Sequence, residues 1–249
     1  MKIKTYTPAD HYIKALIYGA SGSGKTTFGG SAIAKDNSKV LFLSAEKGLM
    51  SIKDKKPKYV EIKSMSDLIE AYTYLNIEDH KFETVVIDSI TEISNILKLE
   101  IEKREGHTMQ LQNWGEIKNK LIGVFRDFRD LPMNVIFLSQ EAYITDEDKI
   151  RKIVPSLDGK GATTAIPRYC DTVGYIKVDI KGNREIFTDH NIKYVTKDRH
   201  NCIDGLLEFT DWIKAIKKTK LEKEEIEEVE VETTIETRSD AIDYKNLLH

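Results

Sequence analysis

The residues with the most distinctive chemistry form one loop near the start of the chain, Gly19-Ala20-Ser21-Gly22-Ser23-Gly24-Lys25-Thr26. Their spacing matches the pattern G-x-x-x-x-G-K-[ST] and follows a short apolar run at 15–18. Glycines let such a loop fold into a nest of backbone N–H groups, and a following helix would point its positive end at the same place. Lys25 could then reach the terminal phosphates of a nucleotide, while the Thr26 hydroxyl could bind Mg²⁺. The pattern predicts a nucleoside triphosphate site formed by this loop and Thr27.

Three further polar residues stand at the ends of apolar runs that read as buried strands: Glu46, Asp88 and Gln140. The carboxyl ends of parallel strands meet at one edge of an open α/β sheet, and ligands bind at that edge. We expect Asp88 to hold Mg²⁺ through its water shell and Glu46 to act as general base for an attacking water. The amide of Gln140 would hydrogen-bond the γ-phosphate and move when that group leaves. A helix N-cap is the alternative interpretation of Asp88.

Apolar runs and helical spacing indicate the elements that must position these residues. Strands are expected at 15–18, 40–43, 59–62, 84–87, 135–138, 172–179, 184–187 and 192–195. Apolar residues at helical spacing predict helices over 26–35, 66–75, 89–105 and 114–131. Strands that alternate with helices imply parallel pairing, whereas the short turn around Gly182 implies an antiparallel extension. Two polar segments, 105–113 and 142–168, are not assigned, and the second is long enough to be a functional loop.

Composition narrows the class of protein. The chain has 249 residues, 40% hydrophobic and 32% charged, which is enough for one sizeable α/β core. It has neither a run of about 18 apolar residues nor an apolar signal-peptide core, so we expect a cytoplasmic protein without a membrane span. Cys170 and Cys202 lack CxxC spacing and are expected to be core thiols in a reducing compartment. The six histidines form no zinc-binding pattern.

The charge is unevenly distributed and divides the chain into two expected parts. Residues 1–219 carry 34 Lys and Arg against 31 Asp and Glu, whereas residues 220–249 carry 4 against 10. We expect a domain over 1–219 followed by an acidic tail over 220–249 that is disordered or marginally helical. The tail either competes with an anionic partner for the domain or is a solubilising extension.

The order of the motifs resembles that of the RecA-like recombinase core: the glycine-rich loop, then strands that end in Glu46, Asp88 and Gln140. The size and the spelling of the motifs are closer to the small phage-encoded RecA-like proteins of the Sak single-strand-annealing group. The resemblance implies a RecA-like P-loop NTPase core of α/β class, with a mainly parallel twisted sheet between helices and an antiparallel C-terminal extension. It also implies an ATPase that uses ATP and Mg²⁺ and is stimulated by DNA, in the host cytoplasm if phage-encoded. The expected partners are single-stranded DNA, further copies in a filament or ring, and a single-strand-binding protein.

The same resemblance implies where DNA would bind. The family's first DNA loop corresponds to 104–113, which contains Arg104, and its second to 142–168, which contains Lys149, Arg151, Lys152, Lys160 and Arg168. Acidic residues offset these cations and no strongly basic stripe exists, so a loop that does not bind DNA is the alternative. Chain length leaves no room for the oligomerisation and DNA-gathering regions of bacterial RecA. We therefore expect single-strand annealing or a recombination-mediator function rather than full strand exchange.

Lys197 and Arg199 lie two residues apart in a late expected strand, a spacing that puts both on one face. In bacterial RecA, a Lys-x-Lys pair at this place reaches a neighbour's ATP across the filament interface. The resemblance therefore implies that Lys197 and Arg199 act in trans, like arginine fingers. Two solvated strand charges are the alternative.

Three other functions fit the nucleotide motifs. A RecA-fold helicase or motor shares them, although no separate ring-forming or unwinding domain is evident. A small-molecule kinase would need an arginine-bearing lid, and Glu46 as a base for water argues against it. A nucleotide-binding interaction protein with negligible turnover is distinguished only by an assay. An ABC-type ATPase is disfavoured because no L-S-G-G-Q-like signature occurs.

Overall fold

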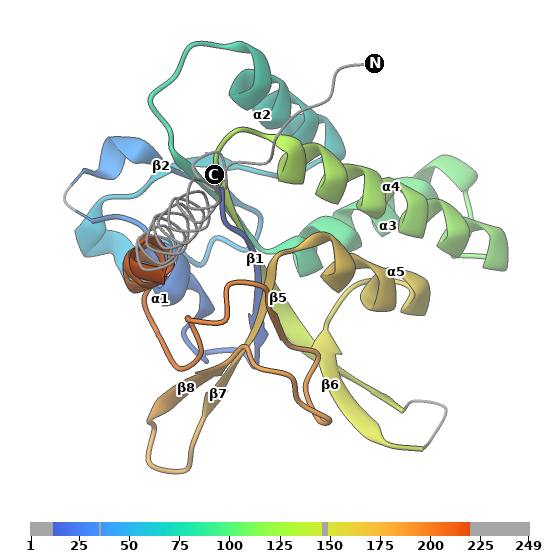
Figure 1. The fold of residues 1–249 in the computed structure, drawn as a ribbon. Helices are drawn as coiled ribbons and strands as arrows, with labels where there is room; N and C mark the ends of the chain where they lie inside the picture. Colours follow the sequence, from blue (N-terminus) through green and yellow to red (C-terminus); the bar gives the residue numbers. More distant parts are fainter. Residues whose placement is uncertain (1–11, 35, 146–148, 220–249) are drawn as a thin grey trace, which may run out of the picture.

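The computed structural model describes residues 12–34, 36–145 and 149–219. Its sheet has the strand order β3-β2-β4-β5-β1-β7-β8, with β6 paired to β5 and β9 paired to β7 (Figure 1). The strands are β1 (Lys14–Gly19), β2 (Val40–Ser44), β3 (Lys58–Glu61), β4 (Thr84–Asp88), β5 (Asn134–Thr145), β6 (Arg151–Pro155), β7 (Thr172–Val178), β8 (Arg184–Phe187) and β9 (Lys197–Asp198). The run from β3 to β7 is parallel, and β6, β8 and β9 are antiparallel to their partners. The predicted parallel sheet with an antiparallel extension is confirmed.

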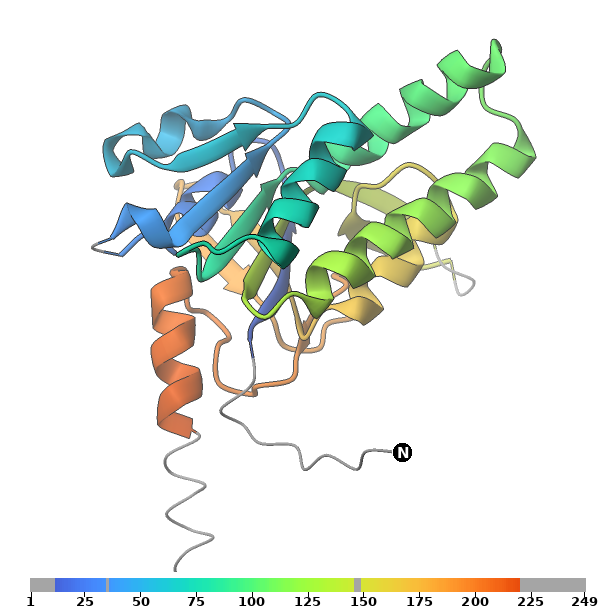
Figure 2. The ribbon, with the colours of Figure 1, turned by 90° about the horizontal axis from the view of Figure 1, so that it is seen from above.

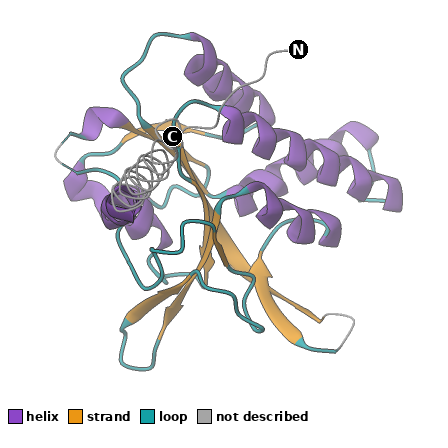
Figure 3. Ribbon diagram, in the orientation of Figure 1, coloured by secondary structure: helices purple, strands orange, loops and turns teal. Residues whose placement is uncertain are grey.

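Helices cover both faces of the sheet (Figure 3). They are α1 (Lys25–Gly30), α2 (Met65–Ile77), α3 (Ile90–Glu105), α4 (Leu111–Asp130), α5 (Lys160–Ala165) and a helical stretch at 209–219. Short 3₁₀ segments are η2 (Asn37–Lys39), η3 (Leu49–Lys55) and η4 (Ile166–Tyr169). No helix among the described residues is long and apolar enough to cross a membrane.

Alternation along the central strands separates two hydrophobic layers. In β1, Leu16 and Tyr18 belong to the layer that packs against α2, α3 and α4, whereas Ala15 and Ile17 belong to the layer under α1 and 209–219. All six residues of β1 are buried because helices cover both faces, as expected for a parallel strand. Figure 2 shows the long α3–α4 pair on one side and the 209–219 helix on the other.

The predicted helical faces of α3 and α4 are confirmed. The buried residues of α3 include Ile90, Ile93, Leu97 and Ile101, and those of α4 are Ile117, Leu121, Phe125 and Phe128. Side chains also set where two helices begin. Ser64 caps α2 in a box with Asp67, and the Ser89 hydroxyl accepts the backbone N–H of Glu92 at the start of α3.

The helix predicted at 26–35 is shorter than expected, because α1 ends at Gly30. Glycine is a poor helix former, yet close packing requires it here. A Cβ on Gly29 would lie 2.9 Å from Val86 Cγ1, and one on Gly30 would lie 2.5 Å from Ile52 Cγ2.

Two other expectations need correction. The unassigned segment 142–168 contains the end of β5, all of β6 and α5, so it is a hairpin and a helix in place of one irregular loop. The strand predicted at 192–195 is absent: Tyr194 makes only an isolated bridge to Ile153, and β9 begins at Lys197. The predicted acidic tail at 220–249 and residues 146–148 of the hairpin lie outside the described residues.

Candidate functional site

Strand pairing brings the predicted site residues to one edge of the sheet. In the register, Gly19 lies beside Gln140, and Asp88 lies beside Ser44, two residues before Glu46. Because β5 separates β1 from β4, Gln140 emerges between the glycine-rich loop and Asp88. The four motifs, remote in sequence, therefore meet at the carboxyl ends of four adjacent strands.

The glycine-rich loop is organised around Lys25, which is buried. Its Nζ donates to the carbonyl oxygens of Gly19 at 2.9 Å and Ala20 at 2.8 Å, and to Oε1 of Gln140 at 3.1 Å. Burial lowers the pKa of Lys25, and the charges of Glu46 and Asp88 oppose that shift. Left-handed backbone at Gly22 and Gly24, with φ of 75° and 103°, shapes the loop.

Thr26 and Asp88 form a second polar pair, with the Thr26 hydroxyl donating to Oδ2 of Asp88 at 2.8 Å. Asp88 is 2% exposed, and burial raises its pKa to about 6 against the effect of that hydrogen bond. A hydroxyl and a carboxylate side by side are the oxygen donors that Mg²⁺ prefers, so this pair fits the metal. The bound cation would favour the ionised form of Asp88.

Glu46 lies on the solvent side of the same site and is exposed. The Ser89 hydroxyl donates to its carboxylate, and Nε2 of Gln140 lies 3.3 and 3.4 Å from its two oxygens. The Asp88–Ser89 peptide bond is cis. Lys25, Gln140 and Glu46 are thus connected in one hydrogen-bonded chain, with the carboxylate held in place but open to water.

These residues border a cavity of about 310 Å³. Its lining comprises Ser21, Gly22, Gly24, Lys25, Thr26, Thr27, Glu46, Gly48, Ser51, Asp88, Gln140 and Arg184. The volume lies at the lower end of the range for small-molecule sites. The hydroxyl of Ser23 is buried and has no hydrogen-bond partner among the described residues, so the loop still holds an unsatisfied donor.

Sequence reasoning missed three residues of this site. Ser89 was expected only to begin a helix, yet it also holds Glu46. Thr91 accepts the backbone N–H of Gln140 at 2.9 Å and donates to the carbonyl of Ser156 at 2.8 Å. Both follow Asp88 within three residues, so proximity to the motif was the available signal. No local signal marks Arg184, which strand pairing brings to Ser23 from 161 residues away in the sequence.

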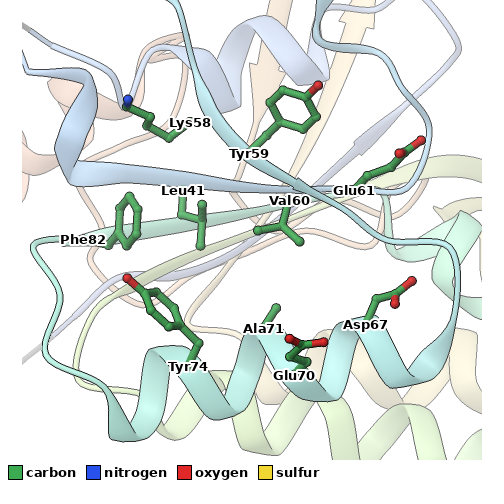
Figure 4. Close-up of a pocket in the computed structure, with 10 residues that line it drawn as sticks. All are labelled: Leu41, Lys58, Tyr59, Val60, Glu61, Asp67, Glu70, Ala71, Tyr74 and Phe82. Atoms are coloured by element: carbon green, nitrogen blue, oxygen red, sulfur yellow. The ribbon is translucent and has the colours of Figure 1, made fainter.

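A separate hollow of about 490 Å³ lies between β3 and α2 (Figure 4). Apolar side chains such as Tyr59 and Tyr74 line it together with the carboxylates of Glu61, Asp67 and Glu70. Lys58 also lines it, so three carboxylates face one cation there. None of the predicted site residues line this hollow.

Lys197 and Arg199 lie at the other end of the sheet. Lys197 is opposite Val173 near the beginning of β7, whereas the glycine-rich loop lies beside the end of β7. Within the chain, Lys197 Nζ donates to the carbonyl of Cys170, and Arg199 forms an ion pair with Asp171 at 3.0 Å. β9 ends at Asp198, and the backbone N–H of Arg199 donates to the carbonyl of Asp171 directly after it.

The structure distributes the predicted DNA-binding cations over several elements. Arg104, at the end of α3, forms ion pairs with Glu105 and Glu116. Arg151 lies over the ring of Tyr143 in the β5–β6 hairpin, 4.2 Å from its centroid. The remaining cations lie at the hairpin turn, in β6, at the start of α5 and in η4; they are Lys149, Lys152, Lys160 and Arg168.

The fold and the site define a class. A mainly parallel sheet with β5 between the loop strand and the Asp88 strand, and with a glycine-rich loop at its carboxyl edge, is a RecA-like P-loop NTPase fold. The sequence pattern of one family, described as an AAA domain, matches residues 11–200, and the chain belongs to that family.

No curated protein matched the sequence. A crystal structure of the RadB recombinase is 16% identical, with a TM-score of 0.45 over 73% of this chain and 82% of that one. An ATPase from the type III secretion system of pathogenic bacteria is 15% identical, with a TM-score of 0.43 over 68% of this chain and 51% of that one.

Proposed function

We propose that the protein binds ATP with Mg²⁺ in the 310 Å³ cavity and hydrolyses it. The observation that carries the proposal is the hydrogen-bonded chain from Lys25 through Gln140 to Glu46, with Thr26 and Asp88 at the same edge. This chain joins a cation that could bind phosphate, an amide and a carboxylate open to water. A simple glycine-rich turn would need neither the Gln140 amide nor the Glu46 carboxylate.

Each residue has a separate task in this reaction. Lys25 and the loop N–H groups bind the phosphates, and Thr26 and Asp88 would hold Mg²⁺, which neutralises phosphate charge when bound. Glu46 takes a proton from a water as the water oxygen bonds to the γ-phosphorus. The bond from that phosphorus to the bridging oxygen breaks, leaving ADP and inorganic phosphate. Ser89 and Gln140 orient Glu46, so the base is in place before substrate arrives.

The proposal extends to single-stranded DNA, in recombination, annealing or repair. Gln140 is followed directly by the β5–β6 hairpin, which carries the Tyr143–Arg151 pair. An aromatic ring beside a cation is a common platform for unpaired bases, and further copies of the chain would assemble on the strand. A RecA-fold motor or a small-molecule kinase are the alternative functions.

One assay separates these functions: steady-state ATP hydrolysis with Mg²⁺, with and without single-stranded DNA, across a range of protein concentrations. Stimulation by DNA that rises cooperatively with protein concentration supports the proposal. Turnover that ignores both would exclude a DNA-dependent assembly, and a screen of phosphoryl acceptors would then test the kinase. ATP binding without any turnover would indicate a nucleotide-binding interaction protein.

A further inference from the structure

Arg184 is the first residue of β8. Its side chain reaches the glycine-rich loop from the side of β1 opposite to β5 and Gln140. β7 runs beside β1 with Ile176 opposite Gly19, and Arg184 pairs with Val178, two residues further along β7. The β7–β8 hairpin thus extends past the level of Gly19, and Figure 1 shows it projecting from the sheet. This extension lets the Arg184 side chain lie over the loop and line the cavity.

The contact between Arg184 and the loop is close. Nε of Arg184 donates to the carbonyl oxygen of Ser23 at 3.0 Å. A Cβ on Gly24 would lie only 2.8 Å from the same nitrogen. The left-handed backbone of Gly24 favours glycine at this position, and the Arg184 side chain packs directly against it.

The charges around the cavity leave Arg184 without an anionic partner. Across residues 12–34, 36–145 and 149–219, no carboxylate forms an ion pair with it. Glu46 is engaged by Ser89 and Gln140, and Asp88 by Thr26. A guanidinium remains charged at any physiological pH, so Arg184 and Lys25 place two cations on one cavity. A polyanion bound in that cavity would contact both cations.

We propose that Arg184 binds the phosphates of the nucleotide in cis. Lys25 is directed toward Gln140, whereas Arg184 lies over Ser23 and Gly24, so the two cations would hold the phosphate chain from different sides. The planar guanidinium suits paired phosphate oxygens better than an ammonium does. Binding would also fix the β7–β8 hairpin against the loop. This inference rests on the proposed ATP site.

Calorimetric titration of ATP, ADP and tripolyphosphate into the full chain tests the proposal. Tripolyphosphate isolates the phosphate contacts from those of the base and sugar. We expect Arg184→Ala to weaken all three by about 10- to 100-fold, as loss of a charged hydrogen-bond donor does. Lys181→Ala is the matched control, because Lys181 lies in the turn of the same hairpin, is exposed and does not line the cavity. Equal affinity of Arg184→Ala and the wild type would overturn the proposal.

Thermal unfolding distinguishes a phosphate ligand from a structural brace of the loop. For a ligand, Arg184→Gln leaves the Tm of the nucleotide-free protein unchanged or higher and reduces the rise in Tm caused by ADP. A lower Tm without nucleotide, together with unchanged tripolyphosphate affinity, would overturn the assignment. If the wild type itself bound neither ATP nor tripolyphosphate, the proposed ATP site would fail, and the inference about Arg184 would fail with it.

Discussion

Lys25 and Gln140 are joined by a hydrogen bond of 3.1 Å from the lysine Nζ to the amide Oε1. The same amide donates toward Glu46, so one side chain lies between the phosphate-binding cation and the expected base. A γ-phosphate that binds Lys25 must compete with the Gln140 amide for it. A bound nucleotide would therefore change the hydrogen bond between Gln140 and Glu46.

Replacement of Lys25 by Ala should abolish ATP binding. The variant loses the buried cation and its bonds to the loop carbonyls, and the affinity should fall by on the order of 100-fold or more. Calorimetry and turnover measure this directly, with Lys53→Ala on the exposed surface of η3 as the control. Unchanged turnover in Lys25→Ala would refute the site.

Replacement of Glu46 by Gln should separate binding from chemistry. The amide can still accept the Ser89 hydroxyl, so the loop geometry and ATP affinity should persist. Without a carboxylate to take the proton, kcat should fall by on the order of 10²-fold or more. Glu61→Gln, which removes a carboxylate that pairs with Lys47 and Lys63, is the control. A kcat within a few-fold of wild type would exclude Glu46 as the base.

The pKa of Asp88 predicts a pH dependence of folding. Burial raises that pKa to about 6 in the folded protein, above the ordinary value for aspartate. The folded state therefore holds this proton more tightly, and stability from this group is lost as pH rises through about 6. Relative to wild type, Asp88→Asn should be about equally stable near pH 4 and more stable by on the order of 3 kcal/mol at pH 8.

Chemical denaturation with a metal chelator and without nucleotide, from pH 4 to pH 8, measures this difference in the free energy of unfolding. A constant difference between the two proteins at all pH values would show that Asp88 titrates normally. Added Mg²⁺ and ATP should narrow the gap at pH 8, because the bound cation favours the carboxylate.

Arg199 provides the cleaner test of action in trans. Lys197 donates to the Cys170 carbonyl, so Lys197→Ala would change the fold locally, whereas the Arg199 side chain is largely exposed and forms an ion pair with Asp171. Arg199→Ala should lose turnover only in the assembled protein. Mixing it with Lys25→Ala should restore part of the activity at composite sites. No restoration at any mixing ratio would count against a shared site.

Removal of residues 220–249 tests whether the acidic tail shields a DNA surface. The cut leaves Trp212 and the helix at 209–219, which pack against Phe28, in place. If the tail competes with DNA, single-strand affinity should rise several-fold at low salt and converge with the full chain at high salt. Fluorescence anisotropy measures the affinity of the truncated and the full chain for single-stranded DNA. Equal affinity at low salt would show that the tail does not compete with DNA.

The convergence of the candidate site residues could be predicted from the sequence because each of them follows an apolar run that predicts a strand. Lys25, Asp88 and Gln140 follow apolar runs, and parallel pairing necessarily brings such ends together. The extent of α1 could not be predicted, because Gly29 and Gly30 meet Val86 and Ile52 only in the folded sheet.

Three other features could not be predicted because they depend on pairing or packing between residues remote in sequence. The hairpin at 142–155 was missed because its strand segments are short and interrupted by charged residues, and only Ile153, Val154 and Pro155 of β6 are buried. The strand expected at 192–195 contains β-prone residues, yet Tyr194 packs against Tyr175 and Phe187 in place of extending the sheet. Arg184 depends entirely on pairing between β7 and β8.

β5 passes from the central sheet into the hairpin without a break, and Gln140 stands at the junction. Gln140 is the last residue paired with β1, and Glu141 is the first paired with β6. The outer part of the strand, Glu141 to Thr145, is about 17 Å long at ordinary strand spacing. One continuous strand thus carries both the amide that contacts Lys25 and Glu46 and the pairing with β6, so a displacement of the backbone at Gln140 would carry Glu141 to Thr145 with it.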